Sequence, residues 1–243
     1  MKYYNGIFGT QNICIGLRQE STLKYFGNWL TPADDYGSAV MVQDEDFKMY
    51  AEKWKIPDNA YTEYALSVFR VCDVLLTNKS CVFHGAAFHW HEKAFLFTAP
   101  SGTGKSTQLF HWCSLYRNDI QIMNGDKPIL AAENNEITVY PSPWKGKEGL
   151  GNDTLKAPLA GIIFLEQGSK NHIARMPISK AVKSLLPRIL TTADNTEIVK
   201  NAGRMLEQIL LSVPVWKLTN TGDLDSAVLT HDTLEKELFS DEI

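Results

Sequence analysis

A glycine-rich turn at residues 99–107 carries the side chains best suited to chemistry. Its sequence, Ala-Pro-Ser-Gly-Thr-Gly-Lys-Ser-Thr, follows the apolar run 95–97 and precedes helix-compatible sequence through Trp112. Backbone N–H groups at the start of such a helix, with the positive end of its dipole, can surround a polyphosphate. The spacing therefore predicts a phosphate-binding loop. The predicted cofactor-binding residues are Ser101, Gly102, Thr103, Gly104, Lys105, Ser106 and Thr107.

Two side chains of this loop have specific expected roles. Lys105 is expected to reach the outer phosphates and to act in catalysis, and the Ser106 hydroxyl is expected to ligate magnesium. The full phosphate-loop pattern has a glycine where this chain has Ala99. Because the remaining residues and the strand–turn–helix context agree, a phosphate-binding loop is favoured over a flexible surface turn.

An acidic residue and a histidine are candidates to complete the site. Asp126 follows the apolar run 119–123, and phosphate-loop proteins hold magnesium with an acidic residue at the end of a neighbouring strand. The alternative is a plain turn aspartate, because Asn-Gly-Asp also suits a turn. His84 precedes a hairpin that returns the chain to the loop. It is expected either to line the site as a catalytic residue or to be structural.

A long connection at residues 141–158 is rich in proline, glycine and lysine. Connections of this length inside a compact domain are either mobile or functional. Lys145 and Lys147, followed by Glu148, could contact phosphate or an acceptor, or could form a solvated surface. These three residues are the candidate substrate loop.

Hydrophobic periodicity and turn residues predict the elements that position these groups. Helices are expected at 44–55, 61–76, 105–116, 178–190, 195–212 and 223–239, with Asp58 or Asn59 and Asp223 as N-caps. Strands are expected at 13–17, 25–29, 39–42, 81–88, 95–98, 119–123, 129–132, 136–140, 159–166, 172–176 and 213–218.

The order of these elements predicts an α/β fold with a mixed β-sheet, a phosphate loop and flanking helices. The hairpin at 129–140 follows the Asp126 strand directly, which argues against a purely parallel sheet. Residues 1–56 are predicted to form a small β-rich N-terminal lobe or sheet extension, and residues 57–243 a nucleotide-binding kinase-like domain. One continuous domain is the alternative.

Composition limits the classes of partner. The 243 residues are 44% hydrophobic and 21% charged with a net charge of −4, which favours neither nucleic acid nor an anionic membrane as partner. The N-terminus lacks the apolar segment of a signal peptide, so a cytoplasmic protein is expected. The four cysteines form no C-x-x-C pair and are expected to be free thiols.

Three motifs together resemble the catalytic domain of HPr kinase/phosphorylase, which shares its fold with ATP-dependent phosphoenolpyruvate carboxykinase. They are His84-Gly85, the loop from Pro100 to Ser106, and the strand that ends in Asp126. The chain is also similar to small HPr-kinase-like proteins associated with modified-peptide (RiPP) biosynthesis, through Asn124-Gly125-Asp126, Ser142-Pro143-Trp144 and Phe164-Leu165-Glu166-Gln167.

This resemblance implies ATP and magnesium as cofactors and phosphoryl transfer to a serine hydroxyl. It implies that Asp126 matches the metal-binding member of the family's two aspartates. The other aspartate, the proposed base, corresponds to Gly125, and Glu148 stands where the family's loop has arginine. His84 matches a histidine close to that base. Asp126 or His84 would then accept the proton.

Three functions remain open at this point. The first is an ATP- and magnesium-dependent phosphotransferase acting on a hydroxyl, expected to be serine, of a peptide, protein or small molecule, with another nucleotide or pyrophosphate as alternative donors. The second is a non-catalytic nucleotide-binding scaffold or sensor, favoured by Ala99 and Gly125. The third, a carboxykinase, is disfavoured by the short chain.

Overall fold

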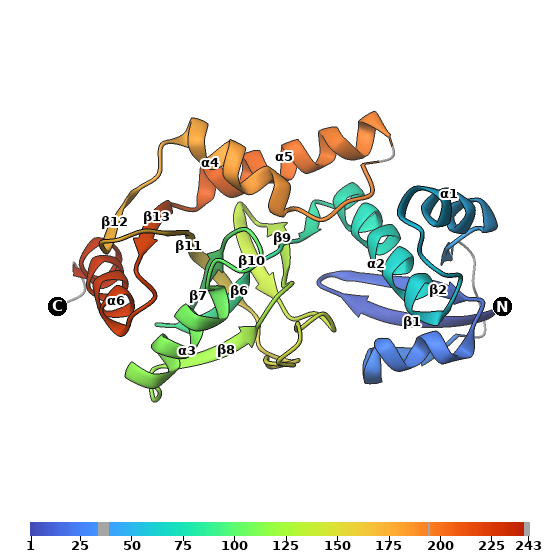
Figure 1. Ribbon diagram of the computed structural model, residues 1–243, viewed down its shortest axis with the longest axis horizontal. Coiled ribbons are helices and arrows are strands. Elements are labelled where there is room, and N and C mark those ends of the chain that lie inside the picture. Colours follow the sequence, from blue (N-terminus) through green and yellow to red (C-terminus); the bar gives the residue numbers. More distant parts are fainter. Residues whose placement is uncertain (34–38, 194, 241–243) are drawn as a thin grey trace.

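The strands form two β-sheets, and helices separate groups of strands along the chain (Figure 1). The computed structural model describes residues 1–33, 39–193 and 195–240. The strands are β1 (Lys2–Phe8), β2 (Gln11–Leu17), β3 (Leu30–Pro32), β4 (Val40–Met41), β5 (Ser80–Val82), β6 (Ala86–Trp90), β7 (Lys93–Thr98), β8 (Ile120–Asn124), β9 (Ile129–Glu133), β10 (Glu136–Tyr140), β11 (Ala157–Gln167), β12 (His172–Arg175) and β13 (Val215–Asn220). The α-helices are α1 (Asp44–Trp54), α2 (Ala60–Thr77), α3 (Lys105–Leu115), α4 (Ile178–Leu185), α5 (Thr196–Ser212) and α6 (Leu224–Leu238), with 3-10 helices η1 (Glu20–Tyr25), η2 (Gly27–Trp29) and η3 (Leu186–Arg188).

The larger sheet has nine strands and mixed direction, which confirms the predicted fold class. Its main path runs β5-β9-β10-β11-β7-β6-β8. The central strand β11 is parallel to β7 on one side and to β13 on the other, whereas β6 and β8 continue the sheet with antiparallel pairings. The predicted hairpin is β9–β10, and both turn residues, Asn134 and Asn135, have positive φ, as such two-residue turns require.

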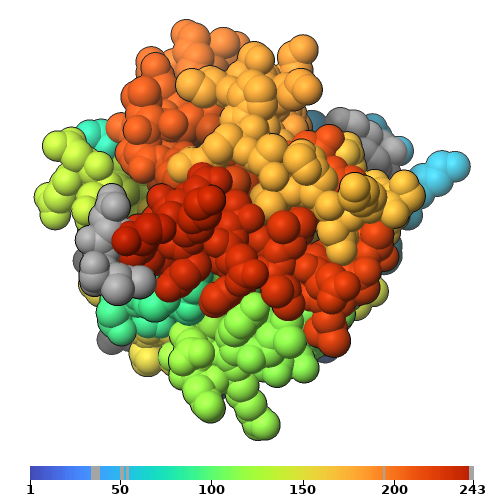
Figure 2. Space-filling view, turned by 90° about the vertical axis from the view of Figure 1, so that its left-hand side faces the viewer, coloured from blue at the N-terminus to red at the C-terminus, as the bar shows by residue number. Residues whose placement is uncertain are grey.

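Helices cover both faces of this sheet. Alternate residues of β7 point to opposite sides: Leu96 packs into the cluster under α4 and α5, and Phe95 and Phe97 pack into the cluster under α3 and α6. Figure 2 shows one end of the molecule, where α6 lies between the α3 segment and the β12–α4 segment. Each such large apolar side chain contributes roughly 1.5–3 kcal/mol on burial, so the sheet is a rigid base for the loops at its edge.

The smaller sheet contains the four N-terminal strands in the order β3-β1-β2-β4, in agreement with the expected β-rich N-terminal extension. Its buried face packs on α2 and on the β5–β9 edge of the larger sheet, in one cluster that includes Phe8, Val71, Val82 and Trp144. Asn59 caps α2 by accepting hydrogen bonds from the backbone N–H groups of two first-turn residues. No helix in the described part of the chain is long and apolar enough to cross a lipid bilayer.

Several predicted elements differ in the structure. The strand expected at 25–29 is wrong: the segment belongs to η1 and η2, and Gly27 has a φ of 58° that a strand cannot accept. Strand β1 was not expected, because Asn5 and Gly6 interrupt its pattern. The helix expected at 178–190 ends at Leu185 and continues only as η3, where Pro187 lacks the N–H that an α-helix needs.

The strand expected at 81–88 is in fact two strands, β5 and β6, which lie far apart in the strand order. The chain crosses between them at residues 83–85. A Cβ atom on Gly85 would lie 3.0 Å from the carbonyl oxygen of Phe97, so the crossing passes close against β7. The small residues mark this crossing, and it places His84 at the sheet edge.

Candidate active site

Three segments meet at one edge of the larger sheet. Strands β7 and β8 flank β6, which is antiparallel to both, so the ends of β7 and β8 lie beside the start of β6. The loop at 99–104 follows β7, residues 124–127 begin at the last residue of β8, and residues 83–85 precede β6. The topology therefore brings together the phosphate loop, His84 and Asp126.

The phosphate loop has the conformation that its glycines allow. Gly102 and Gly104 have φ angles of 78° and 103°, and Gly104 is the N-cap of α3. The first-turn N–H groups of α3 have no partner within the helix and are available to an anion. The helix itself is fixed by its buried Leu109 and Trp112, and by the buried Gln108 side chain, which donates to Ser226 Oγ. The glycine-rich loop is thus attached to a helix whose position is fixed by packing.

Lys105 folds back over this loop, where its ammonium lies 3.4 Å from the carbonyl oxygen of Ala99. Burial lowers the pKa of Lys105; the charge of Asp126 raises it by less, and Arg188 and Lys127 lower it again. The net pKa is below the ordinary lysine value. A phosphate anion would relieve this repulsion among cations. Ser106 and Thr107 make no side-chain hydrogen bond within the described residues, so their hydroxyls are available to a ligand.

Asp126 lies between a histidine and a lysine. Its Oδ1 is 3.4 Å from His84 Nε2, and its Oδ2 accepts from the Lys127 ammonium. Burial raises the pKa of the Asp126 carboxyl, but the hydrogen bonds and charges of His84 and Lys127 lower it by more, and the net pKa is below the ordinary value. Asp126 is therefore ionised at neutral pH.

The backbone around Asp126 is held by a buried asparagine. We call residues 124–127 the acidic corner. Asn124 Oδ1 accepts from the backbone N–H groups of Asp126 and Lys127 at 3.0 and 2.8 Å, and its amide donates to the carbonyl and the hydroxyl of Ser142. The Asp126 carbonyl accepts from Gly85 N–H at 2.9 Å. Because every group of Asn124 is paired, it fixes the direction of the Asp126 side chain.

The connection at 141–158 covers this corner with its backbone. A Cβ atom on Gly125 would lie 3.1 Å from the Lys145 carbonyl and 3.3 Å from the Leu150 carbonyl, and one on Gly146 would lie 3.0 Å from Asp126 Cβ. Gly125, which the resemblance matches to the family's first aspartate, is therefore enclosed by main-chain oxygens. A carboxylate there would need the connection to move.

The charged side chains of the connection do not contact Asp126 in the described residues. Lys145 forms an ion pair of 2.7 Å with Asp153, while Lys147 and Glu148 are exposed at a turn. The first part of the connection is anchored, because Ser142 is buried and Trp144 stacks on Phe8 with ring centroids 5.6 Å apart. The candidate substrate loop thus has a fixed base and a solvent-exposed tip.

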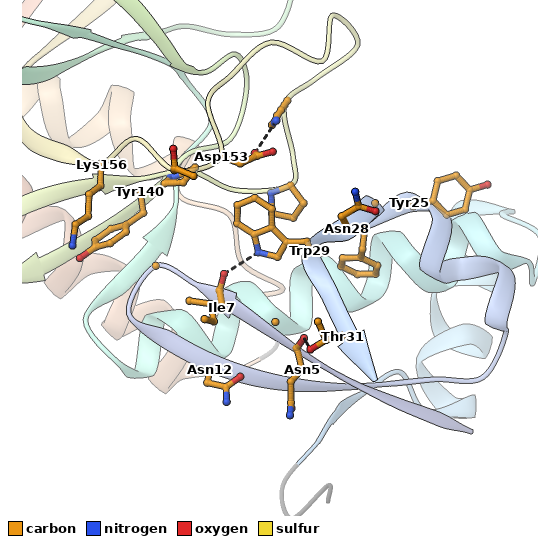
Figure 3. A pocket seen from close by; sticks show the side chains of 18 of the residues that line it. Asn5, Ile7, Asn12, Tyr25, Asn28, Trp29, Thr31, Tyr140, Asp153 and Lys156 are labelled. Atoms are coloured by element: carbon orange, nitrogen blue, oxygen red, sulfur yellow. Dashed lines mark hydrogen bonds and ion pairs between the residues drawn. The ribbon is translucent and has the colours of Figure 1, made fainter. Parts of the chain in front are cut away.

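A cavity of about 1120 Å³ lies on the outer side of the connection, between it and the N-terminal sheet (Figure 3). Trp29 stands at its centre and donates from Nε1 to the Ile7 carbonyl at 2.8 Å. Its charged lining residues are Lys24, Lys145, Lys156 and Asp153, and none of its lining residues belongs to the phosphate loop. We call this cavity the outer groove.

Two basic residues at the site were not predicted. Lys127 contacts Asp126 directly, and Arg188 Nη1 donates to the Ala99 carbonyl at 3.1 Å. Lys127 directly follows Asp126, so its neighbourhood could have been suspected from the sequence. Arg188 lies in η3, far from the loop along the chain, and no sequence signal marked it.

The residues present fit a magnesium ion shared with a nucleotide. Among the described residues, no group of three or more acidic, histidine or cysteine side chains could hold a metal by itself. Magnesium bound to nucleotides usually takes only one or two protein ligands, with phosphates and waters completing its octahedron. An ionised Asp126 and the unbonded Ser106 hydroxyl would supply these ligands. The four cysteines are free thiols, as expected.

Comparison with known proteins adds a distant structural likeness. No family model and no curated protein matches the sequence. Among solved structures, the chain is similar to the Hpr(Ser) kinase/phosphatase from Coxiella burnetii, with 12% identity, a TM-score of 0.41, and coverage of 67% of this chain and 99% of that chain. That structure belongs to the family that the motifs resemble. The similarity is too low to place this chain in it, and the link to modified-peptide biosynthesis remains a hypothesis.

Proposed function

We propose that this protein is an ATP- and magnesium-dependent phosphotransferase that phosphorylates a hydroxyl group, with a serine of a peptide or protein as the first acceptor to test and a small molecule as the second. The observation that supports it most is the meeting of a glycine-rich loop at a helix N-terminus with an ionised aspartate on the same sheet edge. Phosphoryl transfer depends mainly on positioning and on stabilising charge, and this edge supplies both.

The roles follow from the contacts. The backbone N–H groups from Ser101 to Thr107 would hold the phosphates, Lys105 would bind the outer phosphates, and Ser106 and Asp126 would hold magnesium, which supplies charge neutralisation of the phosphate oxygens when bound. In the transfer, the bond between the terminal phosphorus and the bridging oxygen breaks, a bond to the acceptor oxygen forms, and ADP leaves.

His84 is the proton acceptor that we propose. Its Nε2 faces the Asp126 carboxylate, so a neutral imidazole donates from Nε2 and keeps Nδ1 as an acceptor. This assignment of the N–H is inferred from the hydrogen bond. Asp126 would orient the ring and stabilise the imidazolium that forms, as a carboxylate does beside a catalytic histidine. An aspartate at position 125 is then not required.

The outer groove is where we propose that the residues flanking the acceptor hydroxyl bind. Its lining carries three lysines and one aspartate, in a chain whose net charge is −4. This local excess of positive charge favours an acceptor segment with acidic neighbours. Peptides with a central serine and either Glu or Lys at the flanking positions would test it, because only the acidic series should be phosphorylated with a low KM.

Transfer of label from γ-labelled ATP to such peptides tests the function itself. Wild type and Lys105→Ala are compared, with Lys180→Ala on the exposed surface of α4 as the matched control. We expect transfer by wild type and the control, and a loss of about 100- to 1,000-fold in Lys105→Ala, since one preorganised donor at a developing charge contributes this much. Equal transfer by wild type and Lys105→Ala would exclude catalysis at this loop.

The enclosed Gly125 supports a second function, a nucleotide-binding module without transfer chemistry. The same experiment separates the two when ATP affinity is measured by calorimetry. ATP binding that needs Lys105, without turnover of ATP by water or by any acceptor, would favour the module. We place the carboxykinase below both, and no described contact supports it.

A further inference from the structure

A short segment from far along the chain holds the backbone of His84 at the site. The His84 N–H donates to the Arg188 carbonyl at 2.7 Å, and the Leu190 N–H donates to the Val82 carbonyl at 2.9 Å. We call residues 188–192 the strap. Because its two backbone bonds lie on either side of residue 83, the strap sets the position of the backbone from which the His84 side chain extends.

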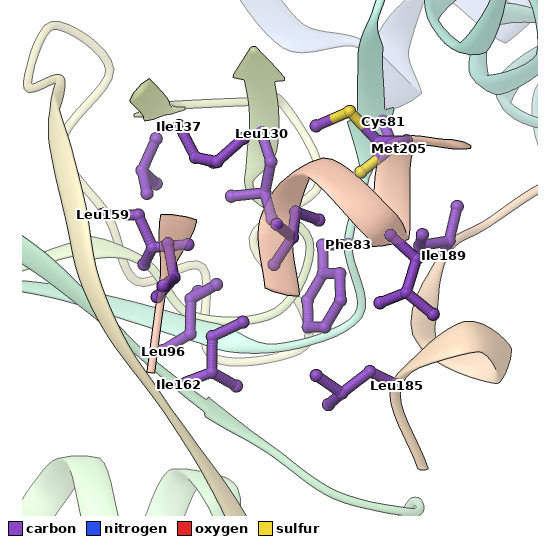
Figure 4. Close-up of a cluster of buried hydrophobic side chains, with 14 of the residues drawn as sticks. Cys81, Phe83, Leu96, Leu130, Ile137, Leu159, Ile162, Leu185, Ile189 and Met205 are labelled. Atoms are coloured by element: carbon purple, nitrogen blue, oxygen red, sulfur yellow. The ribbon is translucent and has the colours of Figure 1, made fainter. Parts of the chain in front are cut away.

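Packing also joins the strap to the crossing segment, but at one position. Ile189 and Phe83 form an isolated bridge, and both side chains are buried in the apolar cluster shown in Figure 4. Beyond Arg188, the last residue of η3, the strap belongs to no helix or strand of the described residues. Regular hydrogen bonding therefore does not hold the far end of the strap, which needs another anchor.

Asp73 of α2 is that anchor. Its Oδ1 accepts from the Thr191 hydroxyl at 2.7 Å and from the Thr192 N–H at 3.1 Å, and its Oδ2 accepts from the Thr192 hydroxyl at 2.5 Å. Asp73 is buried, and hydrogen bonds to a charged acceptor are stronger than those between neutral groups. Three bonds from one carboxylate thus fix two consecutive residues of the strap against α2.

The stability of α2 itself does not explain an aspartate at this position. Aspartate is among the poorer helix formers, and Asp73 lies closer to the negative C-terminal end of α2, at Thr77, than to its N-terminus. Burial of a carboxylate is also costly unless hydrogen bonds compensate it. The compensation comes from the strap, so the contacts of Asp73 serve the strap and not the helix.

We propose that Asp73 is a positioning residue for His84, which fixes the backbone of that histidine through the strap and so keeps its ring facing the Asp126 carboxylate. The inference rests on the proposed function, in which His84 accepts the proton of the acceptor hydroxyl. Asp73 takes no part in proton transfer, and none of its described contacts is with the phosphate loop.

A role in fold stability alone is the competing explanation. The two explanations differ in where the structure loosens when the carboxylate is removed. The matched control is Asn59→Ala, because it removes the N-cap at the other end of α2 and weakens the same helix without touching the strap. A residue that only stabilises the fold would resemble this control, whereas a positioning residue would act on His84 specifically.

The experiment compares Asp73→Ala, Asp73→Asn and Asn59→Ala with wild type. Amide hydrogen exchange by NMR reports local opening at the backbone N–H groups of His84 and Leu190, label transfer gives kcat and KM, and calorimetry gives the Kd of MgATP. For Asp73→Ala we expect exchange at these two amides to be about tenfold faster or more, while the amides of β7 and β11 keep their protection.

We also expect kcat of Asp73→Ala to fall by about 10- to 100-fold, since small displacements of a catalytic group cost this much, with the Kd of MgATP unchanged. Asp73→Asn keeps an oxygen acceptor and should retain most of kcat. If Asp73→Ala does not fold, the Thr191→Val, Thr192→Val double variant carries the test, because it removes two of the three bonds from the side of the strap.

Exchange at His84 no faster than in Asn59→Ala, together with an equal kcat in the two variants, would overturn the inference. If wild type itself transfers no label to any acceptor, the proposed function fails instead. The exchange measurement at His84 does not depend on transfer, so the two failures are distinguishable.

Discussion

The phosphate loop and the acidic corner are neighbours at one sheet edge, but they are built in opposite ways. The loop is a single continuous segment, exposed at Ser101 and Gly102, and its shape follows from local glycines and the start of α3. The acidic corner depends on Asn124, on Ser142 from the connection and on Gly85 from the crossing segment. The comparison teaches that the shape of the loop is set by local residues, whereas the placement of the carboxylate depends on the whole fold.

The most direct test of this difference removes the carboxylate charge of the acidic corner and leaves the loop unchanged. We expect Asp126→Asn to lower transfer by about 100-fold, the scale of a lost charge or proton-handling group. Binding of ATP without magnesium should change little, because the loop is unaltered. Label transfer and calorimetry with and without magnesium measure both effects. A magnesium-independent loss of ATP affinity would contradict this separation.

The same variant has a signature in acid stability. Because the pKa of Asp126 is lower in the folded protein, ionised Asp126 stabilises the fold above the unfolded-state pKa of about 4, and this contribution is lost as the pH falls through the folded pKa. Melting temperatures of wild type and Asp126→Asn should therefore differ most near neutral pH and converge once the pH is below the folded pKa of Asp126.

Removing the support of the corner tests its dependence on distant segments. Asn124 is fully buried and its side chain makes four hydrogen bonds. We expect Asn124→Ala to lower the free energy of unfolding by about 2–3 kcal/mol, since it leaves several buried groups unpaired. Denaturant titration measures this, with the exposed Asn12→Ala as control. A loss below about 0.5 kcal/mol, as at ordinary surface positions, would show that the network is dispensable.

Replacing one glycine in each region, Gly102 in the loop and Gly125 in the acidic corner, compares the two regions through smaller changes in stability. Gly102→Ala should cost about 1 kcal/mol through its positive φ alone, because a Cβ atom there would meet nothing within 4 Å. Gly125→Ala should cost a similar amount by pressing on the connection, and should speed proteolysis near residues 145–150. Limited proteolysis compares them. Equal cleavage of the connection in both variants would mean that the connection does not pack on Gly125.

The smallest expected effect concerns the loop lysine. The pKa of Lys105 lies below the ordinary value, so protonated Lys105 is lost at a lower pH than usual for lysine. ATP affinity should begin to weaken correspondingly early on the alkaline side. In Lys105→Arg the charge persists, and the affinity should stay level over the same range. Calorimetric titrations between pH 7 and 10 measure the difference; parallel curves would contradict it.

The success of the sequence-based predictions follows the same difference between locally determined structure and structure that depends on distant segments. The glycine-rich turn, the helix after it and the mixed sheet could be predicted, because short-range spacing and hydrophobic periodicity determine them. That the turn binds phosphate stays a prediction. Asp126 and His84 were suspected from their place beside strands. Arg188 and the enclosure of Gly125 could not be found, because both depend on contacts between residues distant in the chain. The error at 81–88 has the same cause: a crossing between distant strands looks locally like one strand.

The pairing of residues 82–84 with 188–190 also has a consequence for how the protein is made. During synthesis, the glycine-rich loop and His84 are complete long before Arg188 leaves the ribosome. A nascent chain that ends before η3 would carry the whole phosphate-loop motif without the guanidinium and without the backbone that holds His84. The arrangement of His84 and Arg188 beside the loop would then be completed only near the end of translation, and a premature stop in α4 would release a chain that carries the motif but lacks the finished site.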